Sequence, residues 1–443
     1  MHRTPANHET TTEPTAEMLV STAPATPPVT LSKRITTALA FLCGCIALLM
    51  TGFGIIVPVF PQRLEALGLG AETLALMEGA FGLGMFLFST PLGTLADRIG
   101  RKPIVLISLF GFIVTNLVLA TVNIPLVFIL IRFVEGVIIS GLMPASMAMV
   151  GDTVPRAKQG RWIGFITTAQ AAGFALGPGI GGFLYQAWGF SSPFLISAAI
   201  AFIASLLALV MLPETLSEHV REQVRLRRVN KRQDEKGSNA ASPRVSAMLW
   251  AFMPLLIVDC GITFIYPFVL PQYPFFFAKV LGYSAAQFGV IVSVYGLALA
   301  ASPMLLGCIS EVFPKKLLII LGSLLYSALN VGMLFFHQYT LLIGAAMVTG
   351  IGNALLIPTL STIYLGATAE QNRSQLMGIR GTAISLGTLL GPLAQALASP
   401  WITPQMTFAI GIALSFVITL LAFVVLKPRF TRESELSYRK GET

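Results

Sequence analysis

The chain has 443 residues, of which 55% are hydrophobic and only 11% are charged. A soluble domain carries about 25% charged residues, so this composition argues against an ordinary soluble protein and indicates a surface that mostly meets lipid. The formal net charge of +9 would suggest a nucleic-acid partner only if the charges gathered on one soluble face. They lie instead in turns between apolar runs, which is the pattern of membrane proteins.

The chain begins with a polar segment, residues 1–34, that is rich in Thr, Pro and Glu and contains no apolar signal-peptide core. We expect a disordered cytosolic tail. Apolar runs of about 20 residues, the length that spans a bilayer, then follow in two sets. The runs of the first set are 36–58, 73–95, 104–122, 126–148, 162–185 and 193–212. Those of the second set are 248–270, 285–308, 317–336, 340–363, 377–398 and 405–426.

One long polar insertion, residues 213–247, separates the two sets and contains eight Lys or Arg and five Asp or Glu. We expect a cytosolic linker there, between a six-helix bundle over 35–212 and a second over 248–427. Residues 428–443 form a second cytosolic tail in this interpretation. We do not expect nucleic-acid binding through the basic stretch of the linker.

The distribution of Lys and Arg predicts the orientation. With the N-terminus inside, only Arg63 and Lys279 lie in outer loops, while Arg132 and Arg380 lie within helices. The remaining basic residues then face the cytosol, as the positive-inside rule requires. We therefore expect a multi-pass protein of the cell membrane with both termini in the cytosol.

The two sets of runs are copies of one unit. Comparing residues 68–178 with 282–392, a constant offset of 214, places seven glycines of one window on glycines of the other. The pairs are Gly68/Gly282, Gly82/Gly296, Gly93/Gly307, Gly136/Gly350, Gly164/Gly378, Gly173/Gly387 and Gly177/Gly391. An offset that covers six helices restores the chain direction, so the repeat is parallel and a substrate path is expected between the halves. The predicted fold is an all-α membrane protein with twelve transmembrane helices in two parallel six-helix repeats.

A charged turn lies between the second and third runs. Its residues include Gly93, Asp97, Arg98, Gly100, Arg101 and Lys102, and in the second half Glu311, Lys315 and Lys316 stand at the positions of Asp97, Arg101 and Lys102. We expect Asp152, at the end of the fourth helix, to be a partner of Arg101, and Arg380 to face Asp97 across the two halves. Positive charges in such a turn also set the topology of the chain.

The fifth run contains a glycine-rich segment, Gly173-Phe-Ala-Leu-Gly177-Pro178-Gly179-Ile-Gly181-Gly182. Glycines four residues apart give a helix a flat face that a neighbouring helix can approach closely. Pro178 removes a backbone donor and favours a kink. Such a helix suits either plain close packing or a gate between the halves. The second half keeps Gly387, Gly391 and Pro392 but has Gln395 and Ala396 in place of Gly181 and Gly182.

These segments resemble signatures of the major facilitator superfamily, and the resemblance extends over residues 35–427. The charged turn is similar to the superfamily's loop signature between helices two and three. The glycine-rich segment is similar to the GxxxGPxxGG motif of the drug:proton antiporters, and Arg132-Phe-Val-Glu135-Gly136 is similar to their RxxxG motif. The resemblance implies export of small molecules driven by inward proton flow, with the charged turn closing the cytosolic side when the transporter faces outward.

Proton coupling needs a group inside the membrane that gains and loses a proton. Histidine is the usual group near neutral pH, but none of the four histidines lies in an apolar run; they are His2, His8, His219 and His337. A charge at the bilayer centre costs roughly 2.5–3.5 kcal/mol on insertion scales, so buried carboxylates are functional candidates by default. They are Asp259 in the seventh run, Glu135 in the fourth, three residues after Arg132, and Glu78 in the outer half of the second.

The role of each candidate stays open at this point. Asp259 either binds a proton or cation or makes a structural hydrogen bond. Arg132 and Glu135 share one helix face and form either a fixed structural pair or a proton switch. Glu78 is a third candidate that either takes part in coupling or reaches the outer interface.

The excess of buried acidic groups over deep arginines favours lipophilic cations as substrates, and the aromatic candidates for the substrate cavity are Tyr266, Phe268, Tyr273 and Tyr295. The predicted function is proton-coupled export of small lipophilic or cationic compounds by alternating access. Export of a specific metabolite, such as a sugar, siderophore or amino-acid derivative, is the alternative, and a proton symporter is the third possibility.

An enzyme is disfavoured, because no nucleophile–base constellation or phosphate-cradling loop is present. The four cysteines, Cys43, Cys45, Cys260 and Cys308, suggest neither disulfides nor a metal site. We expect no metal, no cofactor and no nucleic-acid partner. The expected partners of this monomer are the lipid bilayer, protons and the small-molecule substrate.

Overall fold

The computed structural model describes residues 33–215, 243–366 and 373–425, which form α-helices joined by short turns, with no β-strand in these ranges. The helices of the first half are α1 (Lys33–Ile56), α2 (Val59–Ala66), α3 (Ala71–Ile99), α4 (Arg101–Thr121), α5 (Pro125–Thr153), α6 (Arg156–Trp188) and α7 (Ser191–Met211). Those of the second half are α9 (Pro243–Val269), α10 (Gln272–Lys279), α11 (Ala285–Val312), α12 (Lys315–Tyr326), α13 (Ala328–Phe335), α14 (Tyr339–Gly366), α15 (Arg373–Ala398) and α16 (Pro404–Val425). The tails and most of the linker expected above lie outside the described residues.

The described helices make twelve segments that are long and apolar enough to cross a membrane, so the predicted fold is confirmed. Three of these segments are divided into a long and a short helix, which the hydropathy pattern does not show. The predicted run 317–336, for example, is interrupted at Ser327, whose hydroxyl donates to the carbonyl of Leu324 at 2.8 Å. A serine hydroxyl that binds a nearby carbonyl competes with the helical hydrogen bonds and favours such a break.

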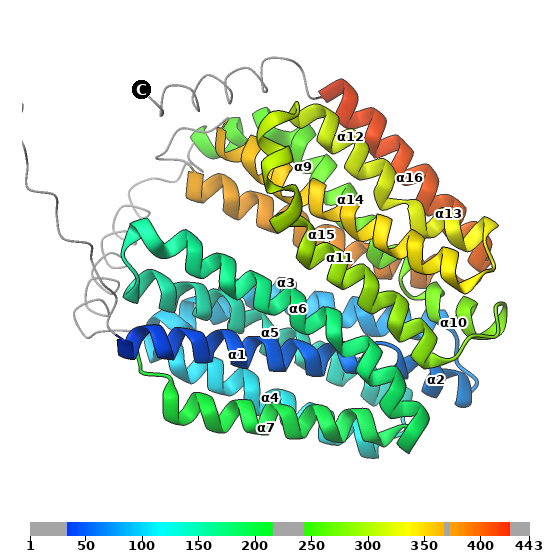
Figure 1. Cartoon of the computed structure of the whole chain (residues 1–443), viewed down its shortest axis with the longest axis horizontal. Helices are drawn as coiled ribbons and strands as arrows, with labels where there is room; N and C mark the ends of the chain where they lie inside the picture. The colour runs from blue at the N-terminus through cyan, green and yellow to red at the C-terminus, as the bar shows by residue number, and fades with distance from the viewer. Residues whose placement is uncertain (1–32, 216–242, 367–372, 426–443) are drawn as a thin grey trace, which may run out of the picture.

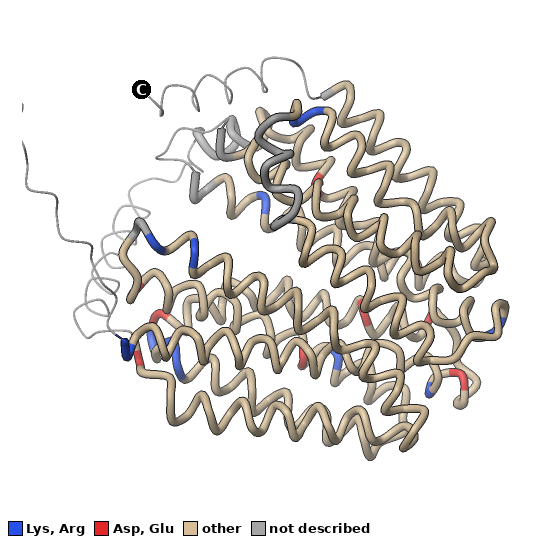
Figure 2. The backbone as a smooth tube through the Cα atoms, viewed as in Figure 1, with Lys and Arg blue, Asp and Glu red and all other residues tan. Residues whose placement is uncertain are grey.

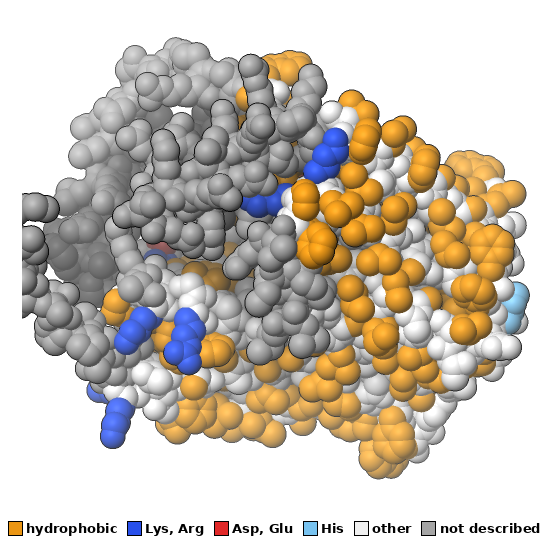
Figure 3. Space-filling view, turned by 45° about the horizontal axis from the view of Figure 1, so that its top comes forward, with side chains coloured by type: hydrophobic (Ala, Val, Ile, Leu, Met, Phe, Trp, Pro, Cys, Tyr) orange, Lys and Arg blue, Asp and Glu red, His pale blue; other side chains and the backbone are white. Residues whose placement is uncertain are grey.

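The two halves form two helical bundles that lie side by side, α1 to α7 in one and α9 to α16 in the other (Figure 1). Each bundle has its own apolar interior. The outer surface is apolar as well: Val210 is 78% exposed and Trp250 is 75% exposed. Hydrophobic side chains also cover much of the face seen in Figure 3. A protein that is apolar both inside and outside is suited to a lipid environment.

The two bundles repeat the same close helix contacts. Gly136 on α5 packs against the carbonyl of Phe81 on α3, and Gly350 on α14 packs against the carbonyl of Tyr295 on α11. Phe81 and Tyr295 are also 214 residues apart in the sequence. The glycine spacing of the sequence therefore reflects one packing arrangement that occurs twice.

The two ends of the molecule differ in their content of Lys and Arg. The basic end contains the start of α1, the turn between α3 and α4, and the start of α12, and Figure 2 shows most of the Lys and Arg there. The opposite end contains the short helices α2 and α10, where Arg63 and Lys279 lie. This separation of charge follows the one expected from the sequence.

The two halves contact each other mainly through α6 against α11 and α3 against α15. Close approaches between the halves include Gly289 beside Pro178 and, nearer the opposite end, Gly182 beside Ala285. Nearer the basic end of α6 and α15, a Cβ added at Gly164 or Gly378 would have no atom within 4 Å. The halves are therefore packed together at the opposite end and are not in contact at these two glycines.

Candidate functional site

Three charged side chains meet inside the first bundle. Nη2 of Arg132 lies 2.6 Å from Oε1 of Glu78, and Nη1 of Arg132 lies 3.0 Å from Oε2 of Glu135. The side chain of Glu135 is fully buried and that of Arg132 is 4% exposed, whereas that of Glu78 is 24% exposed. The predicted pairing of Arg132 with Glu135 is thus present, and Glu78 joins it as a third member. We refer to Glu78, Arg132 and Glu135 as the Arg132 cluster.

Close packing of α3 on α5 brings these residues together. A Cβ at Gly84 on α3 would lie 2.9 Å from the backbone nitrogen of Val137 on α5, and Gly136 faces the backbone of Phe81 in return. Because both contacts are backbone to backbone, the helix axes approach as closely as glycine permits. Glu78 lies about one turn before Phe81 and Arg132 about one turn before Gly136, so their side chains reach each other.

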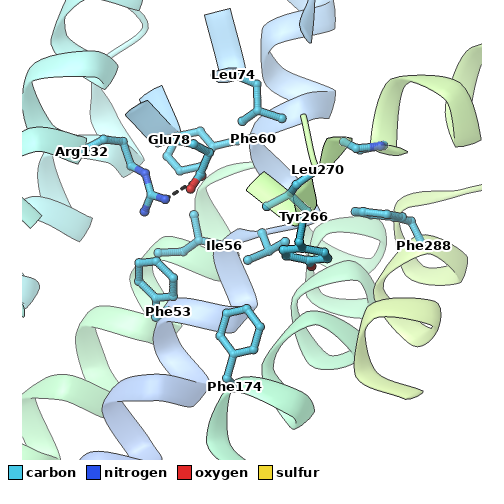
Figure 4. Close-up of a pocket in the computed structure, with 12 residues that line it drawn as sticks. Phe53, Ile56, Phe60, Leu74, Glu78, Arg132, Phe174, Tyr266, Leu270 and Phe288 are labelled. Carbon is cyan, nitrogen blue, oxygen red and sulfur yellow. Dashed lines mark hydrogen bonds and ion pairs between the residues drawn. The ribbon is translucent and has the colours of Figure 1, made fainter. Parts of the chain in front are cut away.

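A cavity of about 60 Å³ lies between the two halves, and Glu78 and Arg132 form part of its wall (Figure 4). That volume has room for a few water molecules. Its other lining residues are apolar or aromatic: Phe53, Ile56, Val57, Phe60, Leu74 and Phe174 from the first half, and Tyr266, Leu270, Pro274 and Phe288 from the second. The guanidinium of Arg132 also lies 5.0 Å from the ring centre of Phe53, within the range of a cation–π contact.

Of the four aromatic residues predicted for the cavity, only Tyr266 lines it within the described part of the chain. Tyr295 is buried behind Tyr266, with the two rings stacked 5.4 Å apart. The hydroxyl of Tyr273 binds the side chain of Asn330, and Phe268 stacks on Phe264 within the second bundle. Phe268, Tyr273 and Tyr295 therefore do not line this cavity, and a contact of these three residues with the substrate stays a prediction.

The second bundle contains its own buried ion pair. Nε and Nη2 of Arg380 on α15 lie 2.8 and 3.3 Å from the two carboxylate oxygens of Asp259 on α9. Nη1 of Arg380 donates to the hydroxyl of Ser361 on α14 at 2.6 Å. The expectation that Arg380 faces Asp97 was therefore wrong. Arg380 binds Asp259 of its own bundle instead, because α15 packs directly against α9.

Replacing Asp259 by asparagine should lower the free energy of unfolding by about 3 kcal/mol, because it leaves the buried Arg380 without its counter-charge. The double variant Asp259→Asn with Arg380→Met should recover most of this loss, since both charges are then absent. Thermal unfolding of the purified protein in detergent measures both effects. A single variant as stable as the wild type would show that Arg380 does not depend on this carboxylate.

The charged turn is held by contacts among α3, α4, α5 and α7 and with the segment after α7. Arg101, at the start of α4, pairs with Asp97 on α3, and its Nε lies 3.2 Å from Asp152 at the end of α5, as predicted. Its backbone nitrogen donates to the carboxylate of Glu214 at 3.0 Å. Lys102 donates to the carbonyl of Leu209 on α7 at 2.7 Å.

The other residues of the turn have simpler surroundings. Arg98 is exposed on the last turn of α3, and Gly93 makes only an ordinary contact with Pro144. The turn thus ties α3, α4, α5 and α7 together within one half. No charge of the other half pairs with Arg101 in the described structure.

Gly100 joins α3 to α4 with a φ of 121°, a region that side-chain-bearing residues rarely adopt. A Cβ there would also lie 2.8 Å from the carboxyl carbon of Glu214. The Gly100→Ala variant should therefore lose about 1–3 kcal/mol of stability. Its thermal unfolding should be compared with that of Gly151→Ala, since a Cβ at Gly151 meets nothing within 4 Å. Equal melting temperatures would contradict the expectation.

The glycine-rich segment has two faces that do different things. A Cβ at Gly177 would lie 2.5 Å from the carbonyl oxygen of Thr51 on α1, and Gly173 and Gly181 face α1 in the same way. Gly182 instead faces Ala285 and Ala286 on α11, and the backbone nitrogen of Gly179 donates to the hydroxyl of Ser293 on α11 at 2.9 Å. Pro178 lies beside Gly289 of α11. One face thus packs within the first half and the other joins the two halves.

Two residues of these clusters were not anticipated as partners. Glu214 stands at the end of an apolar run, at the same end as the charged turn, and that position was a usable signal. Ser361 gave no signal, because a serine in an apolar helix more often bonds to its own backbone. Among the described residues, no group of three or more His, Cys, Asp or Glu is arranged to hold a metal ion.

The family model of the Major Facilitator Superfamily matches residues 42–284 and 255–441 of this chain. Quinolone resistance protein NorA of Staphylococcus aureus (strain COL) is 27% identical over 380 residues, covering 85% of this chain and 94% of that protein. Multidrug resistance protein MdtG of Klebsiella pneumoniae (strain 342) is 29% identical over 365 residues, covering 80% of this chain and 85% of that protein.

A solved structure has the same fold. The bacterial homologue of the human lysosomal transporter Spinster, in an inward-facing and unoccupied conformation, superposes with a TM-score of 0.65 at 14% identity, covering 92% of this chain and 98% of that one. The family match spans both bundles and agrees with the twelve membrane-spanning segments. This chain is a multi-pass membrane transporter that belongs to the major facilitator superfamily.

Proposed function

We propose that the chain is a proton-coupled exporter of small lipophilic cations that works by alternating access. The observation that carries this proposal is the Arg132 cluster, which places two carboxyl groups and one arginine at the wall of an aromatic cavity between the halves. A carboxylate beside aromatic rings attracts an organic cation through charge and through cation–π contacts. The same carboxylate is able to take up a proton when the cation leaves.

The relatives and the packing of the halves support export by alternating access. The names of NorA and MdtG record resistance to quinolones and to multiple drugs. By the positive-inside rule, the basic end faces the cytosol. The halves then meet on the outer side at Gly182, whereas a Cβ at Gly164, nearer the cytosolic side, would have no atom within 4 Å in the described structure. This arrangement is the one expected of a transporter that is open to the cytosol and able to receive a substrate there.

Inside-out vesicles with an acidic lumen test the proposal. Adding lipophilic cations one at a time should discharge the pH gradient, because each cation that enters the lumen is exchanged for a proton that leaves it. The Glu78→Gln variant should lose this response. Glu72→Gln is the matched control. Glu72 is on the same helix, but it lies at the exposed start of α3, where its carboxylate accepts a hydrogen bond from the backbone nitrogen of Gly70.

If folded wild-type protein discharges the gradient with none of the cations, the proposal is wrong for lipophilic cations. If Glu78→Gln responds as the wild type does, the Arg132 cluster does not carry the coupling. Vesicles that contain Asp259→Asn with Arg380→Met test whether the second buried carboxylate, also a candidate, is needed instead.

A further inference from the structure

The two short helices at the end opposite the basic end occupy equivalent places in the two halves (Figure 1). Helix α2 is followed by Gly68 with a φ of 71°, and α10 is followed by Gly282 with a φ of 70°. The offset of 214 residues that relates these two glycines also relates Glu65 on α2 to Lys279 on α10. The repeat therefore has an acidic residue in one copy and a basic residue at the same position of the other.

Glu65 and Lys279 meet between the two halves. Nζ of Lys279 lies 4.0 Å from Oε1 of Glu65. A parallel repeat relates its halves by a twofold axis along the membrane normal. Because this axis exchanges the two positions, equivalent residues that touch must lie at the axis. Residues of like charge would repel each other there, whereas these two attract. We refer to Glu65 and Lys279 as the inter-half ion pair.

Two neighbouring charged residues make their contacts within the first half. Nε of Arg63 donates to Oδ1 of Asn123 at 3.0 Å, and the guanidinium of Arg63 lies 4.9 Å from the ring centre of Phe190. The carboxylate of Glu72 accepts a hydrogen bond from the backbone nitrogen of Gly70. Neither residue is placed to replace a member of the inter-half ion pair.

The inter-half ion pair lies on two helices that line the cavity. Phe60 on α2 and Pro274 on α10 both form part of the cavity wall. Opening the cavity toward this end requires α2 and α10 to move apart, and that movement separates Glu65 from Lys279. The side chains are 38% and 54% exposed, respectively. A pair so exposed adds little to the stability of the fold, but it favours the conformation in which the two charges meet.

Resting on the alternating access of the proposed function, we infer that the inter-half ion pair holds the outer side of the transporter closed while the substrate enters from the cytosol. Its two charges attract when α2 and α10 meet, and water solvates them when the outer side opens. An exposed pair shifts such an equilibrium by up to about fivefold, which still permits opening in every transport cycle. Glu65 and Lys279 are positioning residues that act on the conformation without touching the substrate.

Distances between two spin labels, measured by electron–electron double resonance in lipid nanodiscs, give the ratio of outer-open to outer-closed protein. Thr121→Cys at the end of α4 and Gln338→Cys before α14 place the labels at exposed positions of the two halves, with the native cysteines replaced. Lys279→Gln should raise the ratio about threefold, and Lys279→Glu about tenfold, because attraction becomes repulsion. Exchanging the charges, Glu65→Lys with Lys279→Glu, should restore the wild-type ratio.

Salt separates an electrostatic role from a purely structural one. Raising the salt concentration from about 0.01 M to about 1 M shortens the Debye length from about 30 Å to about 3 Å. This change should raise the ratio in the wild type, lower it in Lys279→Glu and leave it unchanged in Lys279→Gln. Glu72→Gln is the matched control, and it should behave as the wild type does.

The possible failures of this inference and of the proposed function differ. Charge variants that leave the ratio unchanged, or an exchange of charges that does not restore it, overturn the inference and leave alternating access in place. One invariant distance in every protein, at every pH tested and with or without tetraphenylphosphonium, overturns alternating access and the inference together.

Discussion

Replacing Arg132 by methionine should abolish transport and destabilise the protein by about 5 kcal/mol, the upper end of the range for removing one partner of a buried ion pair. The loss is large because Glu78 and Glu135 both depend on this guanidinium, at 2.6 and 3.0 Å. Proton-linked exchange in inside-out vesicles and thermal unfolding of the purified protein measure the two effects.

A further variant separates the loss of folding from the loss of function. The triple variant Arg132→Met, Glu78→Gln and Glu135→Gln removes every charge of the cluster, so it should fold well and still fail to transport. Arg34→Met is the matched control, because Arg34 is exposed at the start of α1. Normal stability and normal transport in Arg132→Met would show that the cluster is not held together by this arginine.

Replacing Gly182 by leucine should stop transport by keeping the two halves from meeting at the opposite end. Its Cβ would lie 2.5 Å from the carbonyl oxygen of Ala285 and from the Cα of Ala286 on α11. Overpacking typically costs about 1–3 kcal/mol, and backbone atoms cannot move aside, so we expect the upper end, roughly a hundredfold shift of the conformational equilibrium.

Thiol labelling from the side of the membrane on which α2 and α10 lie detects this shift of the conformational equilibrium. A cysteine introduced by Phe288→Cys in the cavity wall, with the four native cysteines replaced, should react faster with an impermeant thiol reagent when Gly182→Leu is present. Gly44→Leu is the control, because a Cβ at Gly44 has no atom within 4 Å. Unchanged labelling and full transport in Gly182→Leu would mean that α6 and α11 need not approach so closely.

Gly177→Leu should behave differently from Gly182→Leu although both lie in one short segment. Gly177 faces α1 inside the first half, so its replacement should lower the yield of folded protein instead of shifting the balance between two conformations. The glycine-rich segment therefore contributes both to packing and to the contact between the halves. Of the two roles that the sequence left open, close packing is seen at Gly177, and a gate at Gly182 stays a prediction.

The fold could be predicted from the sequence because its signals are local or strictly periodic. A membrane-spanning helix satisfies its own backbone hydrogen bonds, so a run of about twenty apolar residues is enough to predict it. The repeat was visible because close contacts such as Gly136 on Phe81 and Gly350 on Tyr295 permit only glycine at both positions. The sequence also predicted that Arg101 pairs with Asp152, which the structure confirms, but it did not predict that Arg101 pairs with Asp97.

The pairing of buried charges was decided only by the tertiary structure. Hydropathy identified Glu78, Arg132, Glu135, Asp259 and Arg380 as unusual, because a charge in an apolar run is conspicuous on its own. The sequence did not tell that Glu78 joins Arg132 or that Arg380 binds Asp259, 121 residues away. Such contacts depend on the rotation and depth of two packed helices, and a rotation of one residue position, about 100°, sends a side chain to another neighbour. The sequence determined which residues carry charge in the membrane. Helix packing determined their partners: Arg132 contacts both Glu78 and Glu135, and Arg380 contacts Asp259.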